Sequence, residues 1–454
     1  MGLMDGLKSV IRDAVWGGID DDQRVKYIDK RRAYRKGDQK KQLEIKNGAD
    51  DNITVNFIGL VVDRAVTMLF GKDVEFDLPG EGDSPEQLFI DATWDANKKS
   101  IILQKLATLG AESGTPYVKL IPDGIVGRDG KTYTRLVPQD PKNIEIVTKP
   151  DDIDYVERYV IRWTGVRDGK EVQYRQTIRR VEGAENWEWI TEYKNKNGSN
   201  WIPESEDSWE YDFPPMMHWQ NLADPLSAYG RPDITDDVIV LQDKLNFAAS
   251  NIGKILRFYA HPVTIFKGVN KTDIAYEPGK GVFIPETADA FNLETQGDLV
   301  SSFNFLQFLQ SSLFSITQTV DISSFADKLG ALTNFGLRVL YTDALARLDT
   351  KHELYGDALR EINRRLLVLS GKGTDGGEVK WHDVLPTNET EQTQALEADK
   401  RMGIVSNQTI ATERGYVWED EEERIANDKM KENQGSDNIG AMILNNFNRG
   451  GITR

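Results

Sequence analysis

The longest regular pattern of apolar positions runs from 333 to 369 at intervals of three and four residues, the spacing of one helix face. This stripe consists of Leu337, Tyr341, Ala344, Leu348, His352, Tyr355, Leu359, Ile362 and Leu366. No proline interrupts it, and Thr333 and Asn334 are both suitable N-caps. At 1.5 Å per residue the predicted helix is roughly 50 Å long, whereas globular helices average about 11–12 residues. A helix of this length needs a structural reason.

A second helix is predicted over 233–259 by an apolar seam with the same spacing. The seam consists of Ile234, Val238, Leu241, Leu245, Ala248, Ile252, Ile255 and Tyr259. Asp233, Asp236 and Asp237 lie near the start of this helix, where the helix dipole favours negative charge. The pair His261-Pro262 ends it.

A third helix, predicted over 299–319, has no formal charge from Leu299 to Val320. Its apolar side consists of Leu299, Phe303, Leu306, Leu309, Leu313, Ile316 and Val320, and its other side of Ser, Asn and Gln. This composition is too polar for a membrane span. An uncharged polar face suits either packing against a neighbouring subunit or the wall of a channel, and both interpretations stay open.

The N-terminal region predicts helices and one basic segment, Arg24 to Lys46. Tyr27 and Tyr34 mark the buried side of that segment. We interpret its charges as a solvated helix face, and contact with DNA is the less favoured alternative. The other predicted elements are helices at 3–15, 53–70 (with Ile53 and Leu60 among its buried residues, ended by Gly71), 84–97 and 101–110, and a strand at 74–79.

Between 117 and 194 the pattern changes to period two, which predicts an antiparallel β module. The pairs Asp123-Gly124, Asp129-Gly130 and Asp168-Gly169 are hairpin-type turn signals. Tryptophans recur from Trp163 to Trp219. A sheet that covers its own face explains them better than a platform that stacks sugars or bases.

The remaining segments are shorter. Two strands around a Pro278-Gly279 turn are predicted between 263 and 285, and a strand at 378–386. A helix at 389–402, an acidic helix at 418–433 and a tail with one apolar patch complete the chain.

Composition limits the function. The chain has 454 residues, a formal net charge of −17 and no cysteine. The charge argues against a tight, non-specific grip on nucleic acid, and the missing thiols exclude disulfides and thiolate metal sites. No run of eighteen apolar residues exists, so no membrane span is predicted, and the start of the chain does not match a signal peptide.

We find no catalytic apparatus in the sequence. The run Gly371 to Gly376 satisfies G-x-G-x-x-G, but it follows a predicted helix, which excludes the dinucleotide arrangement. There is no P-loop, and the histidines at 218, 261, 352 and 382 have no metal-binding spacing; His352 is interpreted as a packing or interface residue. Asp151, Asp152 and Asp154 could form the Mg²⁺ site of a nuclease, although a solvated loop is the better interpretation.

The chain resembles the SPP1-like phage portal proteins. The resemblance lies in Tyr34-Arg35-Lys36-Gly37-Asp38 (Y-x-x-G-[DE]), in the block from Asp51-Asn52-Ile53 through Asn56-Phe57 to Gly71-Lys72, in Leu332 to Arg338 at the start of the long helix, and in Gly403-Ile404-Val405-Ser406-Asn407-Gln408-Thr409. The order and spacing of these motifs cover most of the chain. In one departure, Phe335 and Gly336 replace the small Ser-Gly of the family.

This resemblance implies an α+β fold, mostly helical, with the wing, stem, clip and crown of a portal and the antiparallel β module in the wing. It assigns 1–230 to the wing (with helices in 1–115 and the β module in 116–220), 231–260 and 298–320 to two stem helices, 261–297 to the clip, 321–332 to a tunnel loop, 333–388 to a long wing helix and strand, and 389–454 to the crown and tail. The junction of loop and long helix, Thr333–Leu337, is the expected hinge.

The resemblance also implies site residues. They are Asp321, Ser323, Ser324, Phe325, Asp327, Lys328 and Leu329 in the tunnel loop, Lys244, Lys254, Arg257, Gln307 and Gln310 in the stem and lumen, and Lys267, Asn270, Lys271 and Lys280 in the clip. No cofactor, catalytic residue or metal is implied.

The implied function is a ring of about twelve subunits at one capsid vertex, through which double-stranded DNA is packaged and ejected. The implied partners are further copies of the chain, the terminase large subunit, head-completion or adaptor proteins, and major capsid and scaffolding proteins; no membrane is involved. The implied location is the virion, after assembly in the host cytoplasm. Two alternatives stay open: another ring-forming head-tail connector or adaptor, and the Mg²⁺-dependent nuclease.

Overall fold

The structure is a computed structural model. It describes residues 21–45, 50–80, 84–181, 183, 186–195, 198, 200–260, 264–267, 289–292, 299–321, 334–385, 389–418 and 420–427. The chain divides into two compact units, Met1–Leu332 with Arg338–Val384, and Thr333–Leu337 with Leu385–Arg454. The predicted helix at 3–15 lies outside the described residues.

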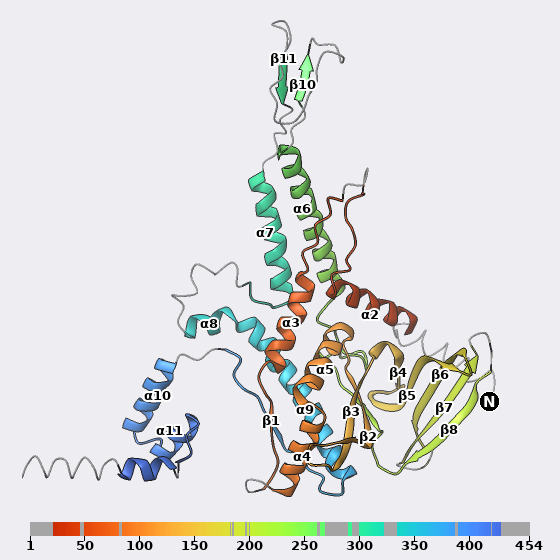
Figure 1. Cartoon of the computed structure of the whole chain (residues 1–454), viewed down its shortest axis with the longest axis vertical. Helices are drawn as coiled ribbons and strands as arrows, with labels where there is room; N and C mark the ends of the chain where they lie inside the picture. The colour runs from red at the N-terminus through yellow and green to blue at the C-terminus, as the bar shows by residue number, and fades with distance from the viewer. Residues whose placement is uncertain are drawn as a thin grey trace, which may run out of the picture. The chain divides into compact units, whose positions relative to one another are not determined.

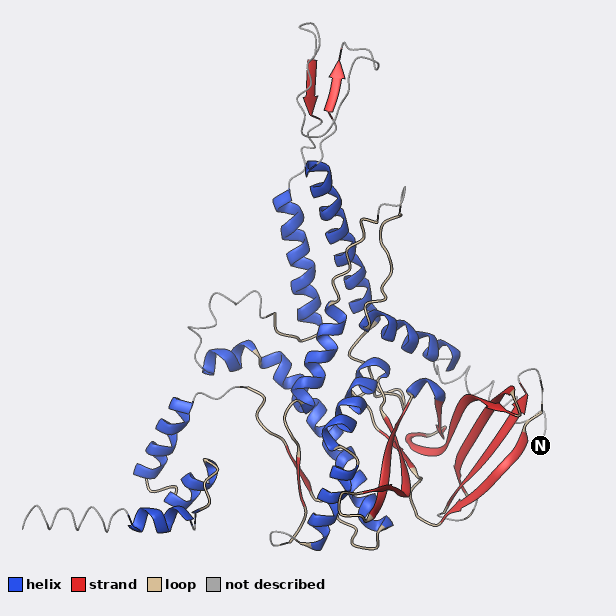
Figure 2. Ribbon diagram, viewed as in Figure 1, coloured by secondary structure: helices blue, strands red, loops and turns tan. Residues whose placement is uncertain are grey.

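The described elements alternate between helical and antiparallel β segments (Figures 1 and 2). The helices are α2 Asp21–Arg35, α3 Phe57–Phe70, α4 Pro85–Ala96, α5 Lys99–Ser113, α6 Asp236–Ala260, α7 Leu299–Ile316, α8 Asn334–Leu340, α9 Thr342–Leu369, α10 Glu389–Arg401 and α11 Asn407–Glu413, with a 3₁₀ turn at Pro141–Asn143. The strands are β1 Glu75–Asp77, β2 Tyr117–Val126, β3 Thr132–Gln139, β4 Ile144–Lys149, β5 Asp152–Arg167, β6 Lys170–Arg180, β7 Trp187–Asn195, β8 Ile202–Trp209, β9 Met216–His218, β10 Thr264–Lys267, β11 Asp289–Asn292 and β12 Glu378–Lys380.

Helix α9 forms the centre of the largest hydrophobic core. Its residues Tyr355, Leu359, Ile362 and Leu366 are fully buried. Among them Asn363 accepts a hydrogen bond from Trp94 Nε1 at 2.7 Å, so the tryptophan's buried N–H is satisfied. A core packed along one face of α9 therefore accounts for the length of this helix.

The long helix has one break that the sequence pattern did not predict. Tyr341 leaves the helical conformation between α8 and α9 with φ −93° and ψ 6°. Beside it, the Thr342 hydroxyl donates to the carbonyl oxygens of Arg338 and Val339. Threonine side chains that bond back to the preceding turn tend to bend helices. The break lies C-terminal to the hinge expected at Thr333–Leu337.

The β module is antiparallel, as predicted, and consists of two sheets. Their strand orders are β3-β2-β9 and β4-β5-β6-β7-β8. Asp168 and Gly169 have φ of 50° and 74° and close the β5–β6 hairpin, which confirms that turn. The turn predicted at Asp123-Gly124 is wrong, because these residues form a bulge within β2 between Ile121 and Ile125.

Helices α6 and α7 form an antiparallel pair that projects from the helical core (Figure 1). Leu245 and Ala248 of α6 pack with Leu309 of α7, which confirms these positions of the two predicted seams. Two other positions of the α7 seam differ from the prediction, because Phe303 and Ile316 are 46% and 48% exposed. In the same way Ile53 and Leu60 on the N-terminal side are partly exposed instead of buried.

Three minor predictions have mixed outcomes. β10 pairs with β11, whereas the second strand predicted between 279 and 285 lies outside the described residues. Gly371, with φ 65°, follows the end of α9, and a Cβ on Gly376 would lie 1.9 Å from Arg360 O. In this glycine-rich run, Gly371 therefore allows α9 to end, and Gly376 allows the backbone to approach Arg360 O closely. His352 stacks on Trp381 with ring centroids 4.1 Å apart, as expected for a packing residue.

Candidate functional site

The outward face of α7 is the most unusual surface in the described part of the chain. Large apolar side chains are exposed on it: Val300, Phe303, Phe305, Phe308 and Ile316, with exposed fractions from 46% to 67%. The prediction that this face of α7 carries only polar side chains is therefore wrong. At helical spacing, Phe305, Phe308 and Ile316 fall on one flank and Val300 and Phe303 on the other. Asn304, Ser311 and Ser315 lie between the flanks and are exposed.

Helix α6 contributes a second exposed stripe, with charges. Lys244 and Lys254, both predicted lumen residues, are exposed. Val240 and Phe247 lie on the same helix face at helical spacing and are 55% and 45% exposed. Arg257, also predicted for the lumen, instead forms an ion pair with Asp51 at 2.5 Å.

The C-terminal end of α7 is held where the predicted tunnel loop begins. Gln310, predicted for the lumen, is half-buried and donates to Asp321 Oδ2 at 3.2 Å. Arg64 Nη1 donates to Val320 O at 2.7 Å. Gln307 is exposed on the outer face of the helix. Asp321 is the only predicted loop residue that the structure describes, since Ser323, Ser324, Phe325, Asp327, Lys328 and Leu329 lie outside the described residues.

Of the predicted clip residues, the structure describes one. Lys267 is exposed at the end of β10, in register with Asp289 of β11. Asn270, Lys271 and Lys280 lie outside the described residues.

A buried ionic cluster lies at the base of the α6–α7 pair. The Asp233 side chain is 1% exposed. Its carboxylate forms ion pairs with Lys351 Nζ at 2.6 Å and with Arg347 Nη2 at 2.7 Å. Burial raises the pKa of Asp233, but the attraction of Lys351 and Arg347 outweighs it and holds the pKa below the ordinary value. Asp233 therefore joins the segment before α6 to the long helix α9.

The sequence interpretation placed Asp233 at the start of the helix, as a charge that favours the dipole. The structure corrects this, because α6 begins at Asp236 and Asp233 lies in the core. The missed signal is the pair Arg347 and Lys351, two cations one helical turn apart beside the apolar stripe. Cations in that position need a buried anion.

A cavity of about 290 Å³ adjoins this cluster. It is an open cavity bounded by α3, α9 and the residues after α7, and most of its surface is apolar. Lys351 and Asp233 line one side, and Thr319 and Val320 line another.

A ladder of buried polar side chains on α6 binds the segment that carries the N-terminal family motifs. Gln242, Asn246 and Ser250 recur at every fourth position and are at most 1% exposed. Asn246 Oδ1 accepts from Val55 N at 3.0 Å, and Ser250 Oγ accepts from Ile53 N at 2.9 Å. The extended segment thus lies beside α6 (Figure 2), and side chains of α6 accept hydrogen bonds from its backbone N–H groups.

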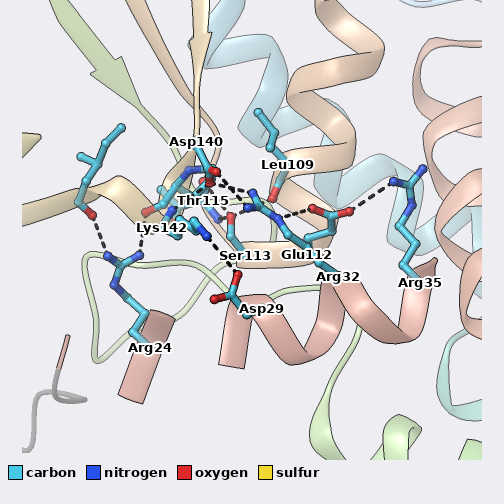
Figure 3. Close-up of polar contacts among 12 residues, drawn as sticks. Arg24, Asp29, Arg32, Arg35, Leu109, Glu112, Ser113, Thr115, Asp140 and Lys142 are labelled. Atoms are coloured by element: carbon cyan, nitrogen blue, oxygen red, sulfur yellow. Dashed lines mark hydrogen bonds and ion pairs between the residues drawn. The ribbon is translucent and has the colours of Figure 1, made fainter. Parts of the chain in front are cut away.

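The basic helix α2 is only in part the solvated face that we predicted, because Lys26 and Lys30 are exposed whereas three of its arginines are engaged within the fold. Arg32 is bidentate to Asp140, with its shorter contact at 2.7 Å, and also contacts Glu112 at 2.9 Å (Figure 3). Arg35 reaches the other oxygen of Glu112 at 3.2 Å. Arg24 is buried and donates to the carbonyl oxygens of Pro141 and Ile144. These arginines join α2 to α5 and to the start of the larger sheet.

The alternative nuclease site has the geometry of a turn. Asp152 Oδ1 accepts hydrogen bonds from the backbone N–H groups of Asp154 and Tyr155, and all three aspartates are exposed. Within the described residues there is no group of three or more His, Asp or Glu side chains arranged to hold a metal ion. Across those same residues, no helix has the length and apolar content to cross a membrane.

Comparisons with known proteins add an independent finding. A family model described as "Phage portal protein, SPP1 Gp6-like" matches residues 19–435. No curated protein sequence matches the chain.

Solved structures give a weaker likeness. A chain from the virion of a native gene transfer agent particle is 13% identical, with a TM-score of 0.44, over 89% of this chain and 95% of that one. A chain from the neck of an empty particle gives the same identity and coverages and a TM-score of 0.47. Such values support no statement about function.

Proposed function

The chain belongs to the SPP1 Gp6-like phage portal proteins, and we propose that its copies form a ring around a channel for double-stranded DNA at one vertex of a phage capsid. In this proposal the α6–α7 pair is the stem, β10 and β11 belong to the clip, and the β module forms the outer wing. The residues from 321 to 332 would form the tunnel loop. The ring has about twelve subunits, as the family resemblance implies.

The observation that carries this proposal is the α7 surface. Five large apolar side chains are exposed on a helix without formal charge, which is costly in water. A neighbouring α6–α7 pair on each flank would bury them. A contact between different faces of identical subunits closes into a ring when the rotation is right.

The polar strip between the flanks suits a channel lined by uncharged side chains. DNA presents one negative charge per roughly 1.7 Å of helix axis. A strongly basic wall would hold DNA in place, whereas Asn304, Ser311 and Ser315 neither attract nor repel it strongly. Lys244, Lys254 and Gln307 remain candidates for the lumen. Arg257 and Gln310 are less suitable, because each is engaged within its own subunit.

The portal role needs no catalysis by this chain. Portal proteins are structural, and we assign ATP hydrolysis to the terminase large subunit, which would dock at the clip near Lys267. Head-completion or adaptor proteins would replace it after packaging, and capsid and scaffolding proteins would contact the wing. A separate adaptor role is the second candidate, although the match of the portal model over 19–435 favours the portal.

Replacing Phe308 by Glu tests the proposed stem interface. The substitution places a charge in the interface and should convert rings to free subunits at micromolar concentration, measured by light scattering with mass determination. Val166→Glu is the matched control, because Val166 is 74% exposed on the β5 strand of the sheet. Rings in the Phe308→Glu variant, or their loss in the control, would contradict the proposed interface.

The tunnel loop has a separate test. Lys328 is the only basic residue from 321 to 332. Lys328→Glu should reduce packaging or DNA retention while rings still form. Loss of ring assembly in this variant would mean that the loop has a structural role instead.

A further inference from the structure

The cavity of about 290 Å³ beside the Asp233 cluster has the size and the walls of a small-molecule site. Three segments supply its apolar wall: Val61, Ala65 and Met68 of α3, Ala344 and Leu348 of α9, and Val320 after α7. Water gains few hydrogen bonds from such a wall, and an apolar cavity of about 150 Å³ already binds benzene. This cavity therefore has room for two fused aromatic rings.

The turn after α7 forms one side of the cavity in a strained conformation. Gln318 lines the cavity with a left-handed backbone, at φ 53°, which is uncommon for residues other than glycine. Two arginines hold the turn by its carbonyl oxygens. Arg347 Nη1 donates to Thr317 O at 3.3 Å, and Arg64 Nη1 donates to Val320 O at 2.7 Å. Backbone strain that is held by its surroundings clusters at ligand sites, and most ligand pockets are formed before the ligand binds.

The charges on the wall favour an anionic ligand. Lys351 and Arg347 are both bound to Asp233, whereas the carboxylate of Asp63 is bound to Arg35 at 3.1 Å. Arg64 is half-buried, and within the described residues it forms no ion pair.

The contacts of Arg64 leave its charge available. Besides Val320 O, its guanidinium lies over the Phe314 ring, 5.8 Å from the centroid. Neither contact neutralises the guanidinium, and a planar guanidinium suits a carboxylate better than any neutral acceptor. The positive charge thus lies at the edge of an apolar space.

We propose that this cavity binds a small aromatic carboxylate or a similar amphiphilic anion, with its rings between α3 and α9 and its anionic group on Arg64. The ligand would contact the turn after α7 and Tyr341 at the break between α8 and α9, since both line the cavity. Its binding would therefore hold these two irregular segments together. The proposal does not depend on the formation of a ring.

Isothermal titration calorimetry of the full-length chain with naphthoate, and with its neutral analogue naphthamide, tests the chemistry. Naphthoate should bind with one molecule per chain and raise the midpoint of thermal unfolding. Arg64→Gln should weaken naphthoate binding about tenfold or more, because a hydrogen bond to a charged group is lost. Naphthamide binding should weaken by less than about threefold. Equal losses for both probes would overturn the role of Arg64.

Filling the cavity tests the location. Ala344→Phe places a ring in the space from α9, and Ala65→Phe does so from α3; each should abolish the binding of both probes. Ala346→Phe is the matched control, because Ala346 is exposed on α9 and lies outside the cavity wall. Circular dichroism establishes that each variant is folded. Native affinity in either folded variant, or lost affinity in the control, would overturn the proposed location.

The outcome is separate from that of the proposed function. The titration is run on rings and on Phe308→Glu subunits, so that a cavity covered in the ring is still tested. Rings with no naphthoate binding in either sample would overturn the ligand site and leave the portal proposal standing. Binding by a chain that never forms rings would support the site and contradict the portal proposal.

Discussion

At the scale of single residues, Asp233 shows how a buried charge fixes the position of a functional element. Its carboxylate receives two cations from α9 and a hydrogen bond from Asn221 Nδ2 at 3.3 Å, and its backbone N–H donates to Ala111 O. Such a cluster contributes little net stability compared with apolar packing, but removing one member leaves the others unpaired. Its main effect is therefore to fix α9 relative to the start of α6.

The first prediction follows from this cluster. Asp233→Asn leaves Lys351 and Arg347 without a counter-charge in the core, and it should lower the free energy of unfolding by about 3–5 kcal/mol. Denaturant unfolding measures this loss. Asp237→Asn, at an exposed position in the first turn of α6, is the control and should change stability by less than about 0.5 kcal/mol. Similar losses in both variants would refute the special role of Asp233.

The second prediction concerns His218, which lies between two tyrosines. Its Nδ1 is 2.8 Å from the Tyr159 hydroxyl, and its ring stacks on Tyr117. Burial, with a smaller effect of the positive charge of Arg365, lowers the pKa of His218 to about 4. The unfolded chain binds the proton more readily, since its histidine has the ordinary pKa of about 6.5. The contribution of His218 to stability is complete above about pH 6.5 and is lost as the pH falls toward about 4.

The measurement compares the native chain with His218→Gln by denaturant unfolding between these pH values. The difference in stability between the two should shrink as the pH falls, because carboxylates elsewhere affect both equally. A difference that stays constant with pH would show that His218 is already protonated, or not enclosed, in the folded chain.

At the scale of elements, the periodic segments were predictable and the non-periodic contacts were not. The stripes of 333–369 and 233–259 and the alternation from 117 to 194 predict the correct element types, because each buries a continuous face. The break at Tyr341 and the bulge at Asp123-Gly124 depend on local hydrogen bonds and strand register, which apolar spacing does not encode. The arginines of α2 looked solvated because their partners Glu112 and Asp140 are distant in sequence.

The candidate site shows the same limit. The sequence predicts a charge-free α7 and exposed lysines on α6. It does not distinguish the exposed Phe305 and Phe308 from core residues, since an interface between subunits and a core have the same composition. The family resemblance assigned Arg257 and Gln310 to the lumen, and their intramolecular partners, Asp51 and Asp321, became visible only in the structure.

The third prediction concerns the polar ladder of α6. Asn246→Ala removes the acceptor of Val55 N and the partner of Gln39 Oε1, so buried polar groups lose their hydrogen bonds. We expect a loss of about 1–3 kcal/mol in stability and faster hydrogen exchange at 53–55. Asn251→Ala, at a half-exposed position on the same helix, is the control and should leave that exchange unchanged. Equal hydrogen exchange at 53–55 in both variants would contradict the proposal that Asn246 holds this segment on α6.

At the scale of the whole molecule, an acidic chain with an uncharged α7 surface suits a conduit for DNA. A net charge of −17 disfavours non-specific retention of nucleic acid by the chain. The apolar flanks of α7 would hold the ring together without presenting charge to the channel.

The fourth prediction concerns salt. If apolar flanks of α7 hold the subunits together, raising the salt from about 0.1 M to about 1 M, which shortens the Debye length from about 10 Å to about 3 Å, should leave the fraction of rings unchanged or higher. Light scattering measures that fraction. Dissociation at high salt would indicate that ion pairs hold the ring.

Electron microscopy of the purified full-length chain tests the central claim most directly. End-on views should show a closed ring with a central channel, and averages should place the α6–α7 pairs next to one another around it. Monomers and dimers alone, at every protein and salt concentration tried, would contradict the proposal that this chain forms a DNA conduit.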